Sequence, residues 1–426
     1  MTLAPRFLLH TAAAILACAL AACGSSSNNS PTSSNVRLVN ATTSTSLRLS
    51  LNGAAYSPSQ APQTISAYAV VAPGTYTVNV ASATASPAAF SQSWPFASAQ
   101  SYTMVAYERS GVIFGAMLTD NLPVPASGVT TLAIANDSPD AGSLDVYVVA
   151  PGTTSISGLL PTFSAVFPLA ESGSSTMTSG SYKVIITGAN NQSDVRFQGS
   201  VSLASAQVDV LAVTSTGGGA VVNTALIVQG GSATFQQAAL ARARLVSVLP
   251  QSPPTAVTAT VGTTVLGPIY APIVGNYTAV VGGSAIANVT VAGSAVTIPA
   301  NIASQVLATG TDSTILLYGT ASPGTVGLFS DTNLSAGSQV DVRVVNVGNS
   351  AADGVTLYIN GVTVATNVPY GTASAYAPLV PASSPSFLFI GGGTSKTTNS
   401  TNLLTGSVYT VFVYDSALDA IIHLDR

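Results

Sequence analysis

The chain contains the same short strand four times, as Val36-Arg37-Leu38-Val39-Asn40, Leu132-Ala133-Ile134-Ala135-Asn136, Ala243-Arg244-Leu245-Val246-Ser247 and Val342-Arg343-Val344-Val345-Asn346. Each segment is apolar at alternate positions and ends in a small polar residue, as a half-buried strand does. The four segments start about 100 residues apart, which is the length of a seven-stranded sandwich. We therefore predict an all-β protein of tandem immunoglobulin-like antiparallel β-sandwiches, with repeats at residues 36–128, 129–234, 235–338 and 339–426.

Turn chemistry supports the same fold. Asn52-Gly53 and Asn360-Gly361 each follow a strand-like run, and Asn-Gly supplies both positive φ values of a type I′ hairpin. Only Ser232 to Ala243 is expected to be helical, as a short connection between the two halves. Strands elsewhere argue against a nucleotide-binding α/β fold. Four sandwiches in a row would extend more than about 100 Å.

The N-terminal residues have the pattern of a lipoprotein signal peptide rather than of a fold. Arg6 precedes an apolar run that ends in Leu20-Ala21-Ala22-Cys23-Gly24, which is typical of a lipobox. We predict a signal peptide at residues 1–22, a lipid such as palmitate on Cys23, and a flexible tether at residues 23–35. An ordinary signal peptide cut at Ala17-Cys18-Ala19 is the alternative. With Gly24 after the lipidated Cys, the sorting rule of enteric bacteria gives the outer membrane, facing the periplasm or the cell surface.

Charged residues are scarce. They make up 6% of the chain, against roughly 25% in an average soluble domain. With a formal net charge of −4, the composition excludes a basic nucleic-acid binder. No charged residue occurs from Leu49 to Tyr107 or from Leu245 to Thr311. These stretches are either plain polar strand faces or a surface for a neutral partner, such as polysaccharide or another envelope protein.

Candidate catalytic residues are few. The chain has no Gly-x-Ser-x-Gly elbow, and its one histidine beyond the signal peptide, His423, is expected to face solvent from the last strand. Glu108 and Glu171 are the only glutamates and lie in different repeats, so they do not form the carboxylate pair of a glycosidase. We predict no catalytic site and no cofactor. An enzyme of unrecognised type would need a polar cleft between repeats that gathers Asp209, Asp312 or His423.

One acidic group could hold a metal ion. Asp137, Asp140 and Asp145 are close in sequence, and a calcium loop uses clustered carboxylates. The favoured interpretation is structural, because Asp137 and Asp140 flank Ser138-Pro139 in a turn where Asp side chains bind backbone N–H groups. The chain is also too poor in His and Cys for a transition-metal site. We therefore predict no metal site.

Two further groups bear on binding. Arg37, Arg244 and Arg343 occupy one equivalent position in three repeats and are expected to project from the outer face of the opening strand. Trp94 and Phe96 lie in an uncharged stretch and could form a stacking platform for a sugar. The alternative is that both rings fill the core of the first sandwich. Gly217-Gly218-Gly219 and Gly391-Gly392-Gly393 are expected to be flexible hairpin loops.

The opening strands, together with Ala135-Asn136-Asp137-Ser138-Pro139-Asp140-Ala141 and Leu144-Asp145-Val146-Tyr147-Val148, resemble the bacterial family known as domain of unknown function 4397 (DUF4397). Members typically have a Ser-Pro-Asp-Ala turn followed by an Asp-Val-Tyr strand that leads to Asn-Gly. Repeat 4 is similar at Leu357-Tyr358-Ile359-Asn360-Gly361, whereas repeat 3 departs most, at Pro250-Gln251-Ser252-Pro253-Pro254. The resemblance implies an envelope-associated immunoglobulin-like sandwich and supplies no catalytic residues.

These observations together predict a membrane-anchored envelope lipoprotein with a non-catalytic structural or adhesive role. A carbohydrate- or peptidoglycan-binding module is the alternative.

Overall fold

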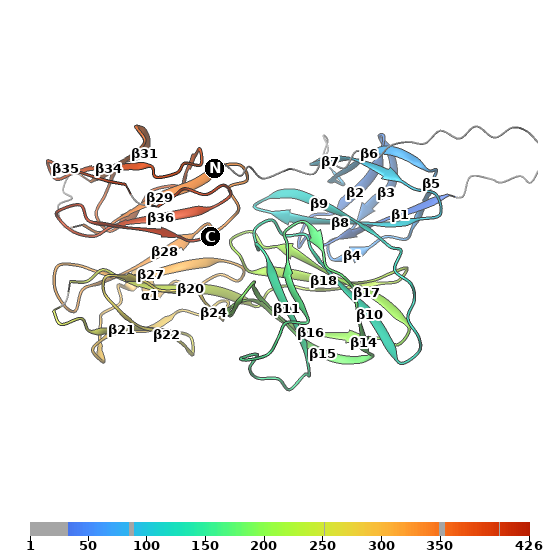
Figure 1. The fold of residues 1–426 in the computed structure, drawn as a ribbon, viewed down its shortest axis with the longest axis horizontal. Helices are drawn as coiled ribbons and strands as arrows, with labels where there is room; N and C mark the ends of the chain where they lie inside the picture. The colour runs from blue at the N-terminus through green and yellow to red at the C-terminus, as the bar shows by residue number, and fades with distance from the viewer. Residues whose placement is uncertain (1–32, 85–88, 251, 349–353, 400) are drawn as a thin grey trace, which may run out of the picture.

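The computed structural model describes residues 33–84, 89–250, 252–348, 354–399 and 401–426. The predicted signal peptide, the lipidation site at Cys23 and most of the tether lie outside these residues. The regular secondary structure of the described chain is almost entirely β-strand, and its strands form eight sheets that pair into four sandwiches (Figure 1). The predicted all-β sandwich fold is therefore confirmed.

Each sandwich joins two sheets of different pattern. One, here called the opening sheet, is mixed, because the opening strand pairs in parallel with a later strand and antiparallel with the rest. The other, here called the second sheet, is antiparallel. The parallel pair differs from the purely antiparallel prediction. It arises because the chain crosses to the second sheet before it returns beside its own first strand.

The opening sheets are built from corresponding strands in each repeat. In sheet order they are β4 (Thr64–Ile65) and β5 (Ala69–Val71), β1 (Ser34–Asn40), β8 (Ser101–Arg109) and β9 (Val112–Thr119) in repeat 1; β13 (Ala170–Glu171) and β14 (Ser175–Thr178), β10 (Val129–Asn136), β17 (Gln207–Ser215), β18 (Val222–Val228) and β19 (Ala233–Gln236) in repeat 2; β23 (Ile273–Val274) and β24 (Thr278–Val281), β20 (Leu240–Ser247), β27 (Asp312–Tyr318) and β28 (Thr325–Asp331) in repeat 3; and β32 (Thr372–Ala373) and β33 (Ala377–Leu379), β29 (Val340–Asn346), β36 (Val408–Val413) and β37 (Ala420–Leu424) in repeat 4.

The second sheets each have four strands. They are β3 (Ala54–Gln60), β2 (Leu47–Leu51), β6 (Gly74–Ser82) and β7 (Phe90–Phe96) in repeat 1; β12 (Phe163–Val166), β11 (Leu144–Val149), β15 (Gly180–Gly188) and β16 (Asn191–Leu203) in repeat 2; β22 (Thr264–Tyr270), β21 (Ala256–Val261), β25 (Ile286–Val291) and β26 (Ser294–Ala295) in repeat 3; and β31 (Val362–Val368), β30 (Val355–Ile359), β34 (Ser386–Gly391) and β35 (Thr394–Asn399) in repeat 4. One short helix, α1 (Ala300–Ala303), follows β26.

Strand alternation builds one core in each sandwich. In β2 the three leucines are buried while Arg48 and Ser50 are only partly buried, so the strand presents one apolar face to the opening sheet. The opening strands differ from this pattern because they are buried on both faces. In β1, Leu38 faces the core of its own sandwich, whereas Val39 packs against the neighbouring sandwich.

The sandwiches pack in pairs through their opening sheets. Val39 and Val105 of repeat 1 meet Ala212 and Ile227 of repeat 2 in one apolar cluster. Leu316 of repeat 3 meets Phe412 of repeat 4 in another, together with neighbouring apolar residues. Figure 1 shows repeat 1 over repeat 2 and repeat 4 over repeat 3, with the two pairs side by side. The expectation of four sandwiches in a row is therefore wrong, because the outer faces of the opening sheets are apolar enough to bury each other.

The expected helix at residues 232–243 is also wrong. The segment forms β19 and the start of β20, and β19 pairs with β18. Ala, Gln and Leu favour a helix locally, but this preference is only a few tenths of a kcal/mol per residue. Pairing between β20 and β27, together with burial of Ala241 and Ala243, outweighs it.

Both Asn-Gly turns form as predicted. Asn52 and Gly53 have φ values of 48° and 82°, and Asn360 and Gly361 have values of 50° and 80°. These positive values are the ones that a type I′ hairpin requires. No helix in the described part of the chain has the length and apolar character needed to cross a membrane.

Candidate functional site

The arginines of the opening strands are buried between sandwiches. Arg37, Arg244 and Arg343 are each at most 2% exposed. Each donates from Nε to a threonine on the parallel neighbouring strand, with N–O distances of 2.8, 2.8 and 3.0 Å to Thr103, Thr314 and Thr410. They do project from the outer face of the opening strand, as expected. That face is covered by the next sandwich, so the guanidinium groups are not available to a ligand from solvent.

Each of these arginines belongs to a set of four side chains that recurs in repeats 1, 3 and 4. The threonine hydroxyl donates to an aspartate at the end of the last strand of the opening sheet or directly after it, and a tyrosine ring lies against the guanidinium. The sets, with the Arg–ring distance, are Arg37, Thr103, Asp120 and Tyr68 (4.5 Å); Arg244, Thr314, Asp331 and Tyr277 (4.6 Å); and Arg343, Thr410, Asp425 and Tyr376 (4.8 Å). Burial, with a hydrogen bond to Asp120, raises the pKa of Tyr68 to about 12.

Repeat 2 lacks the whole set. The strand register places Ala133, Val210, Gln229 and Ser174 at the four positions. The interface between repeats 1 and 2 therefore differs from the interface between repeats 3 and 4. Between repeats 3 and 4 the contact is reciprocal, because Arg244 bonds to Asp425 at 2.5 Å and Arg343 bonds to Asp331. Between repeats 1 and 2 it is one-sided, because Arg37 donates to the backbone carbonyls of Gly231 and Val228 at 2.6 and 3.0 Å.

A second group of ion pairs joins the two pairs of sandwiches. Asp140 of repeat 2 is fully buried and accepts two hydrogen bonds of 2.7 Å from Arg109 of repeat 1. It also accepts the backbone N–H of Ser335, which lies between β28 and β29, at 2.7 Å. Arg426 reaches the carbonyl of Pro139. Asp140 was expected to bond within its own turn, and the structure instead makes it a contact between repeats.

Arg242 links repeat 3 to repeat 2 in the same region. Its guanidinium bonds to Asp312 of its own repeat and to Asp194 of repeat 2, the latter at 2.6 Å. Burial raises the pKa of Asp194, but Arg196 and Arg242 outweigh it and hold the pKa below its usual value. The carboxylate of Asp194 is therefore ionised at neutral pH and acts as a fixed partner for both arginines.

A cleft of about 310 Å³ lies beside these ion pairs, at the junction of repeats 2, 3 and 4. It is lined by His423 together with Asp194, Arg196 and Asp425. His423 is half-buried there rather than facing solvent as expected, and burial and Arg244 lower its pKa. Of the three residues that an enzyme cleft was expected to gather, only His423 lines it. Asp312 is paired with Arg242, and Asp209 bonds to Thr130 in the opening sheet of repeat 2.

The other two aspartates of the acidic group, Asp137 and Asp145, differ in their hydrogen bonding. Asp145 accepts the backbone N–H groups of Ala165 and Asn190, both at 2.8 Å, which is a structural role. Asp137 is 4% exposed, and its Oδ2 has no hydrogen-bond partner among the described residues. Burial, with Glu171, raises its pKa well above the usual value. Within the described ranges, no three His, Cys, Asp or Glu side chains are grouped in a way that could hold a metal ion.

Trp94 and Phe96, the aromatic pair on β7, face the core of the first sandwich. Phe96 is 2% exposed and packs edge-on against Tyr76 and Tyr102, and Trp94 is partly buried against the same core. Phe96 therefore presents no ring face to a sugar. This is the arrangement expected if the two rings fill the core.

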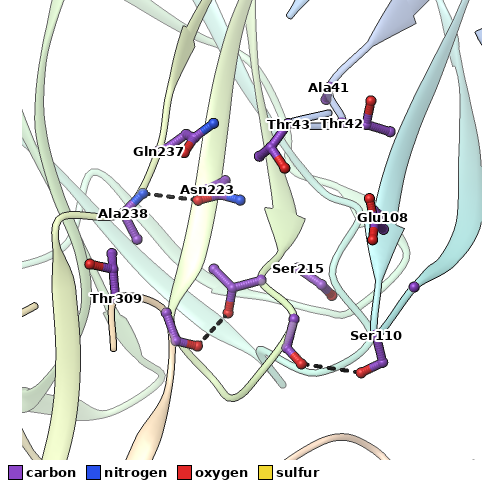
Figure 2. A pocket seen from close by; sticks show the side chains of 14 residues that line it. Ala41, Thr42, Thr43, Glu108, Ser110, Ser215, Asn223, Gln237, Ala238 and Thr309 are labelled. Atoms are coloured by element: carbon purple, nitrogen blue, oxygen red, sulfur yellow. Dashed lines mark hydrogen bonds between the residues drawn. The ribbon is translucent and has the colours of Figure 1, made fainter. Parts of the chain in front are cut away.

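A second cavity, of about 280 Å³, opens where repeats 1, 2 and 3 meet (Figure 2). We call it the three-repeat pocket. Repeat 1 supplies residues 41–43, Glu108, Ser110 and Gly111. Repeat 2 supplies residues 215–217 and Asn223, and repeat 3 supplies Gln237, Ala238, Thr309 and Gly310. Figure 2 shows Glu108 on one wall and Asn223 on the opposite one. Sequence reasoning noted Glu108 only as one of two glutamates, because nothing local shows that the repeats meet there.

The first glycine triplet is part of this junction. Gly218 forms an isolated parallel bridge with Thr311 of repeat 3, and a Cβ on Gly219 would lie 2.7 Å from the carboxyl carbon of Asp312. Gly217-Gly218-Gly219 therefore lies in the loop of the β17–β18 hairpin, as expected, but this loop packs against repeat 3. The absence of side chains lets repeat 2 approach repeat 3 closely.

Residues 34–147 match the family described as Domain of unknown function (DUF4397), which confirms the resemblance over repeat 1 and the first strands of repeat 2. No curated protein is significantly similar in sequence. Among solved structures, the Bacillus anthracis TIE protein aligns with 86% of this chain and 66% of its own, at 9% identity and a TM-score of 0.15. A "Putative cell adhesion protein" from Parabacteroides distasonis aligns with 70% of this chain and 98% of its own, at 10% identity and a TM-score of 0.16. Scores this low carry no argument about function.

Proposed function

We propose that this chain, whose residues 34–147 match the DUF4397 family, is a lipid-anchored outer-membrane protein with a non-catalytic structural or adhesive role. The observation that carries the proposal is that its few charged side chains join the repeats to one another. Six arginines each make a contact that crosses from one repeat to another: Arg37, Arg109, Arg242, Arg244, Arg343 and Arg426.

Such contacts favour a rigid structural role over a catalytic one. Buried ion pairs contribute little net stability, yet they penalise every other packing of the same surfaces strongly. The four sandwiches are thereby held in one arrangement, and Ser, Thr and Asn predominate on the exposed strand faces. A rigid and weakly charged body on a polar tether suits presentation or adhesion at the envelope.

The anchor is the lipid expected on Cys23. Ten residues of chain, from Gly24 to Ser33, separate it from β1 and reach at most about 35 Å when extended. The sandwiches would therefore stay close to the membrane surface. A carbohydrate- or peptidoglycan-binding role remains the second candidate, and the three-repeat pocket favours it.

The anchor is tested by labelling cells with radioactive palmitate and by separating their membranes. We expect Cys23→Ser to lose the label and to leave the outer-membrane fraction. Cys18→Ser is the matched control and should behave as wild type. Label retained in Cys23→Ser, or lost in Cys18→Ser, would contradict the proposed anchor.

The role is tested with cells that lack the gene and are complemented with either form. Wild-type protein should restore attachment or envelope integrity, and Cys23→Ser should not. Protease treatment of intact cells shows whether the protein faces the surface. Equal complementation by both forms would contradict an envelope role that depends on the anchor.

A further inference from the structure

We infer that the three-repeat pocket is a binding site for a hydroxylated ligand with a protonated amino group, of the hexosamine class. The inference rests on the second candidate function, carbohydrate binding, and it is independent of the lipid anchor. It follows from how the pocket is held, from its one carboxylate, and from the chemistry of the rest of its wall.

The pocket is preformed by hydrogen bonds between repeats. Ser110 of repeat 1 donates to the carbonyl of Gly217 in repeat 2 at 3.2 Å. Thr216 of repeat 2 donates to the carbonyl of Gly310 in repeat 3 at 2.8 Å. The N–H of Ala238, in the segment between β19 and β20, donates to the side-chain oxygen of Asn223 of repeat 2 at 2.9 Å (Figure 2). The three walls are therefore fixed before any ligand arrives, which lowers the entropic cost of binding.

Glu108 supplies the charge. Its neighbours Tyr107 and Arg109 point toward repeat 2, where they bond to the backbone of Asp137 and to the carboxylate of Asp140. Glu108 points into the pocket and is half-buried, and its carboxylate has no hydrogen bond or ion pair to any described residue. Among the described residues, no Lys, Arg or His lines the pocket. A ligand ammonium would give this carboxylate a charge-assisted hydrogen bond, whereas an anionic ligand would be repelled.

The rest of the wall consists of hydroxyl and amide groups. Thr43, Thr309, Gln237 and the amide nitrogen of Asn223 make no hydrogen bond to other described residues. Amides and hydroxyls both donate and accept, which is the capacity that ring hydroxyls of a sugar require. In the part of the chain that the structure describes, Ala41 and Ala238 are the only apolar side chains in the lining, so an apolar ligand would find no matching surface.

The size of the pocket agrees with one or two sugar rings. Its volume of about 280 Å³ lies just below the range for small-molecule sites, about 300 to 1,000 Å³. Glu108 and Asn223 stand on opposite walls of this volume (Figure 2). The geometry therefore points to a ligand that combines a cation and several hydroxyls in one compact unit.

The test is titration of the full-length protein with glucosamine, N-acetylglucosamine, glucose and ethanolamine, at a mildly acidic pH that keeps the amines protonated. We expect glucosamine to bind with a Kd in about the millimolar range, and the other three at least about tenfold more weakly. Glu108→Gln should remove the preference for glucosamine. Thr43→Trp changes an exposed lining residue and should block the pocket.

Glu171→Gln is the matched control, because Glu171 is the only other glutamate and lies outside the pocket. It should bind glucosamine as wild type does, and unchanged melting temperatures would show that all variants are folded. The inference would be overturned if N-acetylglucosamine or ethanolamine bound as tightly as glucosamine, or if glucosamine did not bind. It would also be overturned if Glu108→Gln bound glucosamine as tightly as wild type does. None of these results would alter the outcome of the Cys23 labelling, so the two proposals fail separately.

Discussion

Replacement of Asp331 by Asn is expected to loosen the contact between repeats 3 and 4. The carboxylate is fully buried, is paired with Arg343, and accepts hydroxyl hydrogen bonds of 2.6 Å from both Thr314 and Tyr277. Burial raises its pKa, but Arg343 and Arg244, with these hydrogen bonds, hold the pKa below its usual value. The variant leaves a buried guanidinium without its counter-charge, which typically costs about 3 to 5 kcal/mol.

The assay is urea unfolding combined with hydrogen exchange of the amides in β29 and β36, because the four sandwiches need not unfold in one step. Asp419→Asn is the control, since Asp419 and Lys396 form an ion pair that is 43% and 37% exposed, and exposed ion pairs contribute little to stability. If Asp331→Asn and Asp419→Asn cost the same, the reasoning about this interface is refuted.

Three further outcomes are expected. Asp137→Asn should raise the melting temperature at neutral pH, because burial raises the pKa of Asp137 and makes its ionisation in the folded protein unfavourable. The gain in melting temperature should vanish as the pH falls below the unfolded-state pKa of about 3.9. A difference between variant and wild type that stays constant across pH would contradict this. Asp194 and Asp331 have lowered pKa values, so both carboxylates stabilise the folded protein fully above about pH 4. This contribution is lost as the pH falls through their folded-state pKa values. Small-angle scattering should therefore show the repeats separating only in acid. Trp94→Ala should cost about 1 to 3 kcal/mol in thermal unfolding without changing glycan binding, and reduced glycan binding with unchanged stability would favour the platform instead.

The sequence predicted the strands better than it predicted their environment. Alternation in Val36-Arg37-Leu38-Val39-Asn40 correctly indicated a strand with one face in the core. It could not show that Arg37 and Val39 are buried too, because an arginine flanked by apolar residues has the same pattern whether water or another sandwich lies beyond it. The helix expected at residues 232–243 failed for a related reason, since its local preference is weaker than pairing with β18 and β27.

One signal for the interfaces was present in the sequence. The Arg, Thr, Asp and Tyr positions occur together in repeats 1, 3 and 4, and all four change together in repeat 2, to Ala133, Val210, Gln229 and Ser174. Joint retention and joint loss indicate that the four side chains act as a unit. The repeat pattern was evident, but which residues of different strands touch depends on register, which a strand sequence specifies weakly.

The sequence by itself determined the all-β class, the four opening strands and the two Asn-Gly turns, because period-two alternation and turn geometry are set by residues a few positions apart. Only the tertiary structure decided that the sandwiches pack two by two, that the arginines bond to groups of other repeats, and that Glu108 lies in a pocket made by three repeats. These features join residues as far apart as Arg109 and Ser335, and they depend on complementarity between whole sheet faces.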